Sequence, residues 1–209
     1  MPINLAIKKI ERNIVELNDM NNFQELVKKN RSYRRFWQEV AISKKKLEEL
    51  VDCARLVASG RNIQPLKYYL SYTPEMNAKI FPHLKWAGHL KNWAGPEEGE
   101  RPSAYIVVLL DRQIAENAYI DHGIAMQTLL LAAVESGLGG CMIASINKEK
   151  LRTLLAIEEN RYDILAVVAL GKPKEIVRLV DMQGDEYKYW RNEKDEHFVP
   201  KRLLKDIII

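Results

Sequence analysis

Cysteine is scarce in this chain, since Cys53 and Cys141 are the only two among 209 residues. Two cysteines are too few to staple a protein of this size, and they lack the paired spacing of a zinc knot or a redox motif. Their scarcity excludes a disulfide scaffold and favours a reducing compartment.

Long apolar runs are also missing. The longest one, over residues 124–134, is interrupted by Gln127 and Thr128. It is shorter than the roughly 18 residues that a membrane-spanning helix needs, so we expect a buried core helix there. The first residues contain no apolar segment behind a basic one, so no secretory signal is predicted. We therefore expect a cytoplasmic protein that has no membrane partner.

The excess of positive charge is small, with 32 Lys and Arg against 28 Asp and Glu and a net charge of +4. This excess admits an anionic ligand but falls short of a dedicated nucleic-acid binder, so we expect no nucleic acid as partner. The apolar share of 47 % is typical of a packed domain and excludes a disordered chain. The four histidines show no spacing of metal ligands, and the sequence has no P-loop, Rossmann fingerprint or nucleophile motif.

Helical and strand patterns mix along the chain without the strict repeat of βαβ units. Apolar residues at helical spacing predict helices up to about residue 29 and over residues 43–59, 119–138 and 147–155. Runs of β-prone residues predict strands over residues 67–73, 104–110, 141–143 and 164–170. The mixture predicts an α+β fold, with helices around a central sheet.

Two other segments are less regular. Residues 81–102 contain Trp86 and Trp93 with several Gly and Pro, which indicates a long aromatic loop or short helices over a site. The final residues, 207–209, are three isoleucines. An exposed β-prone edge of this kind invites aggregation, so we expect it to be paired, within this chain or with another subunit.

A basic cluster is the first candidate binding feature. Five of the eight residues from Lys28 to Arg35 are Lys or Arg, and they surround the hydroxyl of Ser32. Guanidinium groups bind phosphate oxygens in pairs and a hydroxyl adds a neutral donor, so the cluster suits a phosphate. A solvated helix end explains the same residues, because basic side chains favour the negative end of the helix dipole.

A polar turn over residues 58–65 is the second candidate. Its Ser, Asn and Gln side chains offer donors and acceptors that can read the edge of a flat heterocycle, although a plain helix stop explains them too. The glycines at positions 137, 139 and 140 are equally ambiguous. They allow either the close approach of a ligand or the capping of a helix.

Taken in this order, the segments resemble the FMN-dependent nitroreductase family. The family's Arg-Arg-Ser-x-Arg-x-Phe pattern corresponds to residues 30–36, and its Pro-Ser-x-x-Asn-x-Gln-Pro-Trp loop corresponds to residues 58–66. A buried helix ending in Gly-Leu-Gly and a strand closing on Gly-x-Pro follow. The chain departs from these patterns at three positions: Asn30, Ala58 and Leu66. The resemblance implies a helical extension over residues 1–22 and an FMN-binding domain over residues 23–209.

The resemblance also implies where the flavin binds. Arg31 and Ser32, together with Lys201 and Arg202, would hold the FMN phosphate. Arg34 would reach toward the ribityl and pyrimidine side of the flavin. A cation there is chemically reasonable, because the reduced flavin carries negative charge on that side.

Two further groups of residues complete the implied site. The loop that contains Ser59, Asn62 and Gln64 would come from the partner subunit, so that the site exists only in a dimer. Backbone groups would lie near flavin N5 at three consecutive residues: Ile143, Ala144 and Ser145. The implied fold is a helix-flanked, largely antiparallel sheet, in a homodimer whose subunits exchange their C-terminal segments.

The implied activity is that of an FMN-dependent oxidoreductase with NAD(P)H as co-substrate. It would pass a hydride in a ping-pong reaction to a nitroaromatic, quinone or enone, with Trp86 and Trp93 as candidates to line the pocket. No catalytic acid or base is expected, because the flavin itself carries the chemistry. The alternative is a non-catalytic flavin-binding or storage protein of the same fold, in which residues 81–102 exclude the nicotinamide.

Overall fold

The computed structural model describes residues 22–90 and 93–209. The helical extension expected over residues 1–22 therefore lies, except for its last residue, outside the described residues. The described chain begins with a helix over residues 22–29, as the sequence predicts. Within the described ranges, no helix is both long and apolar enough to cross a membrane.

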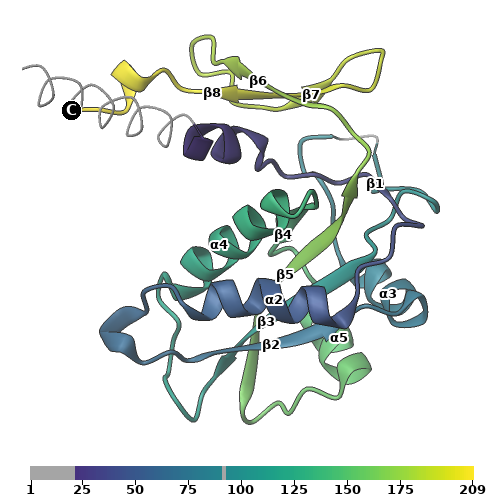
Figure 1. Ribbon diagram of the computed structural model, residues 1–209, viewed down its shortest axis with the longest axis vertical. Helices are drawn as coiled ribbons and strands as arrows, with labels where there is room; N and C mark the ends of the chain where they lie inside the picture. Colours follow the sequence, from purple (N-terminus) through teal and green to yellow (C-terminus); the bar gives the residue numbers. More distant parts are fainter. Residues whose placement is uncertain (1–21, 91–92) are drawn as a thin grey trace, which may run out of the picture.

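A five-stranded sheet forms the centre of the molecule (Figure 1). Its members are β1 (Phe36–Trp37), β2 (Leu66–Ser71), β3 (Ala104–Asp111), β4 (Gly139–Ile143) and β5 (Tyr162–Pro173). The long β5 pairs with β3 along one edge and with β4 along the other, β2 pairs with β3, and β1 pairs with the last residues of β5. All of these pairings are antiparallel, which confirms the largely antiparallel sheet.

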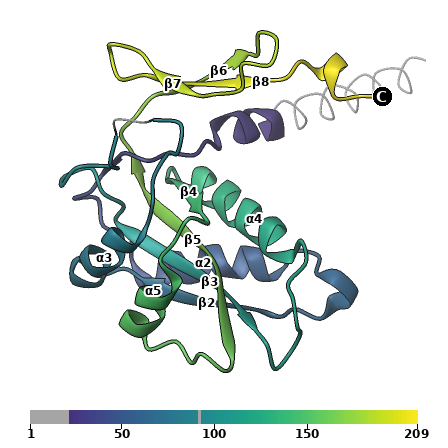
Figure 2. The ribbon, with the colours of Figure 1, turned by 180° about the vertical axis from the view of Figure 1, so that it is seen from behind.

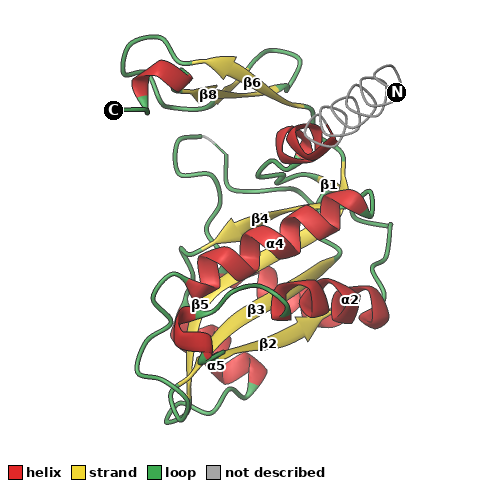
Figure 3. Cartoon of the chain, turned by 60° about the vertical axis from the view of Figure 1, so that its left-hand side comes forward, coloured by secondary structure: helices red, strands yellow, loops and turns green. Residues whose placement is uncertain are grey.

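Helices cover both faces of this sheet. They are α2 (Lys44–Arg55), α3 (Pro74–Ile80), α4 (Asp121–Glu135) and α5 (Lys148–Leu155). Side chains alternate along a strand, so Ile106 and Val108 of β3 pack under α2 and α4, whereas Tyr105 and Val107 pack against α5. Figure 3 shows α2 and α4 together on one face. All eight residues of β3 are buried, which explains why this strand is a continuous apolar run.

Capping residues set several helix ends where the sequence indicates. The side chain of Ser43 accepts a hydrogen bond from Lys46 N, 3.1 Å, at the start of α2. Asn147 does the same for Lys150 N, 3.2 Å, at the start of α5. The long apolar helix is shorter than expected, because α4 ends at Glu135 and Gly137 takes a left-handed φ of 72°.

The next two glycines serve packing inside β4. A Cβ atom on Gly139 would lie 2.6 Å from the ring of Tyr33, and one on Gly140 would collide with the carbonyl oxygen of Ala169. These glycines therefore let two neighbouring segments of this chain approach β4. The structure resolves the ambiguity of the glycine cluster in favour of helix capping and close backbone packing.

A second, three-stranded sheet lies beyond the end of β5, apart from the main sheet (Figures 1 and 2). It consists of β6 (Val177–Asp181), β7 (Trp190–Arg191) and β8 (His197–Lys201), with β8 in the middle. Strand β6 runs parallel to β8 and β7 antiparallel to it. Residues 207–209 are exposed after a single 3-10 turn and form no strand with the described residues of this chain, and their pairing with another subunit stays a prediction.

The described residues of the aromatic segment, 81–90 and 93–102, are irregular after a 3-10 turn at Phe81–His83. Its Trp86 is 8 % exposed and belongs to the core on the α5 side of the sheet. Trp93 is half-buried under the guanidinium of Arg191, 4.3 Å from the ring centre. The expectation that Trp86 lines an open pocket is therefore wrong.

Candidate functional site

The basic segment is fixed against the start of β4. It follows the helix over residues 22–29 in an extended form, and Ser32 makes a parallel bridge with Gly140. The backbone N–H of Tyr33 donates to the carbonyl of Gly140, 3.0 Å. These contacts add the segment to the edge of the main sheet, so the positions of Arg31, Ser32 and Arg34 are set by a rigid strand.

Two of its arginines have no acidic partner in the part of the chain that the structure describes. Arg31 donates to the carbonyl of Val27, 2.7 Å, and Arg34 to the carbonyl of Ser32, 3.2 Å. Within residues 22–90 and 93–209, neither guanidinium forms an ion pair and the buried Nε of Arg31 has no hydrogen-bond partner. Burial lowers the pKa of Arg31. An anion placed here would offset the cost of this buried charge.

The neighbouring Arg35 is different, because two carboxylates neutralise it. Its guanidinium binds Glu100 in a bidentate pair, with 2.8 Å between Nη2 and Oε1, and it also pairs with Asp195. Hydrogen bonds from Arg35 lower the pKa of Glu100 to about 2. Arg35 is therefore structural, whereas Arg31 and Arg34 remain free for a ligand within the described residues.

A buried thiol lies beside this segment. Burial raises the pKa of Cys141, while the charge of Arg34 and the side chain of Ser32 act in the opposite direction. A buried thiol with a raised pKa is a poor nucleophile. Cys141 is therefore part of the floor of the site and not a reactive group.

Glu175 ties the C-terminal sheet to the basic segment. Its Oε1 accepts from the backbone N–H of Arg34 and from that of Arg35, the latter at 3.3 Å. Its Oε2 lies 3.0 Å from Nη2 of Arg191 on β7, and the carboxylate is completely buried. His197 of β8 lies 3.9 Å away, but burial and the charges of Arg34 and Arg191 lower its pKa to about 4. His197 is therefore neutral near pH 7.

Aromatic residues of the C-terminal region lie over Arg34. Its guanidinium carbon is 5.0 Å from the ring centre of Tyr189, and that ring packs against His197 with 5.1 Å between centroids. The backbone N–H of His89, from the aromatic segment, donates to the Tyr189 hydroxyl at 3.4 Å. The C-terminal region and residues 81–102 thus meet above Arg34.

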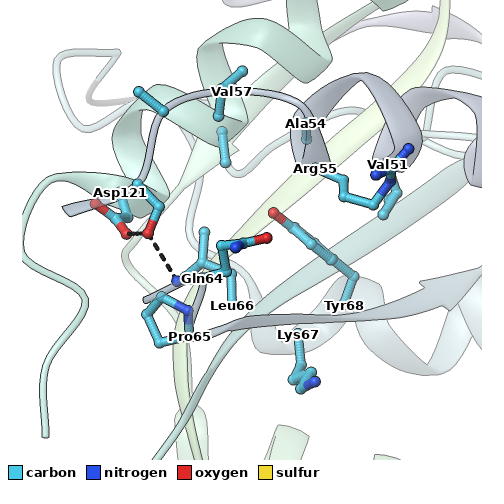
Figure 4. Close-up of a pocket in the computed structure, with 13 residues that line it drawn as sticks. Val51, Ala54, Arg55, Val57, Gln64, Pro65, Leu66, Lys67, Tyr68 and Asp121 are labelled. Carbon is cyan, nitrogen blue, oxygen red and sulfur yellow. Dashed lines mark hydrogen bonds between the residues drawn. The ribbon is translucent and has the colours of Figure 1, made fainter. Parts of the chain in front are cut away.

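The polar turn follows the C-terminal end of α2, and a separate set of hydrogen bonds holds it in place. Asp121, the first residue of α4, accepts hydrogen bonds from Ser59 Oγ, 2.6 Å, and from Gly60 N, 3.0 Å. A pocket of about 300 Å³ lies beside the turn, between α2, β2 and the start of α4 (Figure 4). In Figure 4 the amide of Gln64 points toward the hydroxyl of Tyr68. Burial and the charge of Asp121 raise the pKa of Tyr68 to about 12.

The structure brings only part of the expected flavin site together. Strand β4 connects the basic segment, beside Gly140, with Ile143 at the other end of the strand. The exposed Ala144 and Ser145 follow directly, and Ser145 O accepts from Lys85 N at 2.9 Å. The residues predicted for the phosphate side and for the N5 side of the flavin thus lie near the two ends of one strand, and their roles in binding stay predictions.

Two other groups of the expected flavin site are not brought together with the basic segment in the described chain. No hydrogen bond or ion pair among residues 22–90 and 93–209 connects the turn at Ser59–Gln64 with Arg31 or Ser32. Lys201 and Arg202 are exposed, and Arg202 pairs instead with Asp185 at 3.3 Å. Their roles in FMN binding stay predictions. Asp121 and Glu175 were missed by the sequence reasoning, because an acidic residue at a helix start or after a strand carries no signal by itself.

The donor set suits an organic anion better than a metal ion. The described residues contain no group of three or more His, Cys, Asp or Glu side chains that could hold a metal. They do contain two unpaired guanidinium groups and a hydroxyl on a rigid strand edge. This arrangement fits the phosphate and pyrimidine ends of FMN.

Comparison with known proteins identifies the family. The family model described as "Nitroreductase family" matches residues 27–172, which is more than half of the chain. The chain belongs to the nitroreductase family. The match includes the basic segment, the polar turn and β4, but it ends before the C-terminal sheet and the Lys201–Arg202 pair.

The individual relatives of this chain are distant. A protein of Archaeoglobus fulgidus named for an NADH dehydrogenase or NAD(P)H nitroreductase is 28 % identical over 180 residues, covering 82 % of this chain and 91 % of its own. A nitroreductase of Exiguobacterium sibiricum solved in complex with FMN has a TM-score of 0.60 at 22 % identity, covering 73 % and 88 %. An NAD(P)H:FMN oxidoreductase of Staphylococcus epidermidis reaches 0.65 at 16 % identity, covering 90 % and 94 %. The last two likenesses show a shared fold.

Proposed function

We propose that this nitroreductase is an FMN-dependent NAD(P)H oxidoreductase. The observation that carries the proposal is the pair of unpaired arginines, Arg31 and Arg34, which flank Ser32 on a segment fixed to β4. The names of the curated relative and the FMN complex of a structural neighbour support the same assignment. When bound, FMN would supply the redox chemistry, accepting a hydride from NAD(P)H at N5 and giving it to an acceptor.

This chain's residues would bind and orient the cofactor. Arg31 and Ser32, with Lys201 and Arg202, would hold the phosphate, and Arg34 would stabilise negative charge on the pyrimidine side. Backbone groups of Ile143, Ala144 and Ser145 would face the N5 side. Because position and electrostatics suffice for this chemistry, we assign no catalytic acid or base. The acceptor is a nitroaromatic, a quinone or a small enone.

The proposal includes a homodimer. An exposed apolar surface adjoins the polar turn, and its members line one hollow of about 730 Å³: Ile63, Ile114, Tyr119 and Ile120. Tyr119 and Ile120 are 77 % and 72 % exposed. An apolar surface of this kind is typical of a contact with another protein. A second copy would cover it and bring the turn to the basic segment of its partner, while the exposed residues 207–209 would extend across the dimer.

We also propose a cytoplasmic location, because a chain with only two cysteines suits a reducing compartment.

Rapid mixing of the FMN-loaded protein with NADH and with NADPH tests the activity. Loss of the flavin absorbance near neutral pH, followed by recovery when a quinone is added, is the expected result for at least one nucleotide. If neither nucleotide bleaches the bound flavin, the oxidoreductase proposal is wrong and the storage alternative, with residues 81–102 excluding the nicotinamide, takes its place.

A further inference from the structure

The loop Ser59–Gln64 has a backbone that residues with side chains rarely adopt. Arg61, Asn62 and Gln64 have φ angles of 52°, 57° and 54°. These values lie in the left-handed region, which is unfavourable for residues other than glycine. Such a backbone persists only where its surroundings fix it. The loop therefore depends on contacts that hold its shape.

Asp121 supplies the central contacts. Its two oxygens accept from Ser59 Oγ, 2.6 Å, and from Gly60 N, 3.0 Å, so that both are used by the loop. The same Ser59 Oγ accepts from Gln64 N, 2.9 Å, which closes the loop upon itself (Figure 4). The carboxylate thus fixes the loop at its start directly and at its end through one hydroxyl.

The carboxylate is itself rigidly placed. Asp121 is 6 % exposed and begins α4, where the positive end of the helix dipole favours a negative charge. Helix α4 is anchored in the core through fully buried residues such as Leu129 and Ala133. The shape of the loop is therefore coupled to a helix that is anchored in the core.

The loop presents two amides to the outside. Asn62 and Gln64 are both exposed, and Gln64 Nε2 donates to Asn62 Oδ1 at 3.1 Å, so the two side chains act as a unit. No described residue of this chain uses the remaining polar atoms of this unit. They are available to another molecule.

We propose that Asp121 is a positioning residue for cofactor binding: it fixes the loop so that Asn62 and Gln64 meet the flavin held by the partner subunit. This inference rests on the proposed function, since it requires an FMN-binding homodimer. It assigns Asp121 a role that acts through the loop, without contact with the flavin.

Asp121→Asn is the informative variant. The asparagine keeps the size of the side chain and one acceptor for Gly60 N, but its amide group would oppose the Ser59 hydroxyl, which loses its acceptor. We expect FMN to bind at least tenfold more weakly, with kcat at saturating FMN within about twofold of wild type. Ser59→Ala should act in the same direction. Asp52→Asn on the exposed face of α2, where Asp52 pairs with Arg55 at 2.7 Å, is the control and should bind FMN normally.

Mixed dimers test the positioning role across subunits. Subunits carrying Asp121→Asn and subunits carrying Arg31→Glu are co-expressed with different tags and purified as the mixed species. One site of this dimer combines an intact Arg31 with an intact loop, whereas the other contains both defects. The mixed dimer should therefore bind one FMN under conditions where neither parent dimer binds any.

The outcomes separate the two proposals. Wild-type protein that binds no FMN would overturn the proposed function and this inference with it. If the wild-type protein binds FMN, and the two single variants Asp121→Asn and Ser59→Ala both bind it as tightly as wild type does, the inference alone is wrong. A mixed dimer without FMN would overturn the claim that Asp121 serves the partner's site.

Discussion

Glu175 joins the C-terminal sheet to the basic segment, and its loss should destabilise the protein strongly. Glu175→Gln keeps the shape of the side chain and one oxygen for the backbone N–H of Arg34. It removes the charge opposite Arg191, which is 10 % exposed and then retains only the exposed Asp195, 4.0 Å away. Removing one partner of a buried ion pair costs about 3–5 kcal/mol, because it leaves the other charge uncompensated. Because Arg191 keeps its contact with Asp195, we expect the loss of stability to lie near the lower end of this range.

A loss of about 3 kcal/mol corresponds to a decrease in Tm of roughly 6–12 °C for a chain of this size. Thermal unfolding followed by circular dichroism measures it. Asp185→Asn makes the same chemical change in an exposed pair, with Arg202 at 3.3 Å, and should change Tm by no more than about 1 °C. The double variant Glu175→Gln, Arg191→Met should be more stable than the sum of its single effects predicts. Equal Tm values for wild type and Glu175→Gln would refute this reasoning.

Two further predictions concern acid stability and assembly. His197 has its pKa lowered to about 4 and Glu100 to about 2, so the unfolded chain binds protons at higher pH than the folded protein does. Resistance to urea should therefore fall as the pH decreases from about 6.5. The variant His197→Gln should make this resistance less dependent on pH above pH 4.5. If the resistance of the wild-type protein does not change with pH, these groups do not contribute to its stability. Ile120→Asp should convert the proposed dimer to a monomer in size-exclusion chromatography with light scattering, whereas an unchanged dimer mass would place the interface elsewhere.

Most strands and helices of the main sheet were predictable because their signals are local, whereas the short elements β1 and α3 were not predicted. Strand β3 is buried on both faces and therefore reads as an uninterrupted apolar run. Ser43 and Asn147 cap helices through hydrogen bonds to a residue three positions away. A contact between residues three positions apart can be recognised within a short stretch of sequence.

The C-terminal sheet was not predictable on the same grounds. Strands β6 and β8 are short, only partly buried and parallel, and β8 contains Pro200, which argues against a strand in isolation. Their pairing depends on a return of the chain across residues 182–196. No local pattern records a contact of this kind.

The site divides in the same way. Arg31, Ser32 and Arg34 could be proposed from the sequence, because a basic cluster around a hydroxyl suits a phosphate and the family pattern matches there, and their binding role stays a prediction. Asp121 was not, because its partners Ser59 and Gly60 lie 62 and 61 positions away. Only the fold shows that this carboxylate belongs to the loop.

The central claim is that this protein binds FMN through Arg31, and an FMN titration followed by absorbance and flavin fluorescence tests it most directly. Wild-type protein should bind one FMN per chain, whereas Arg31→Glu should bind none while keeping the wild-type circular dichroism spectrum. Wild-type protein that leaves the flavin spectrum and fluorescence unchanged, or an Arg31→Glu variant that binds FMN as tightly as wild type, would contradict the account.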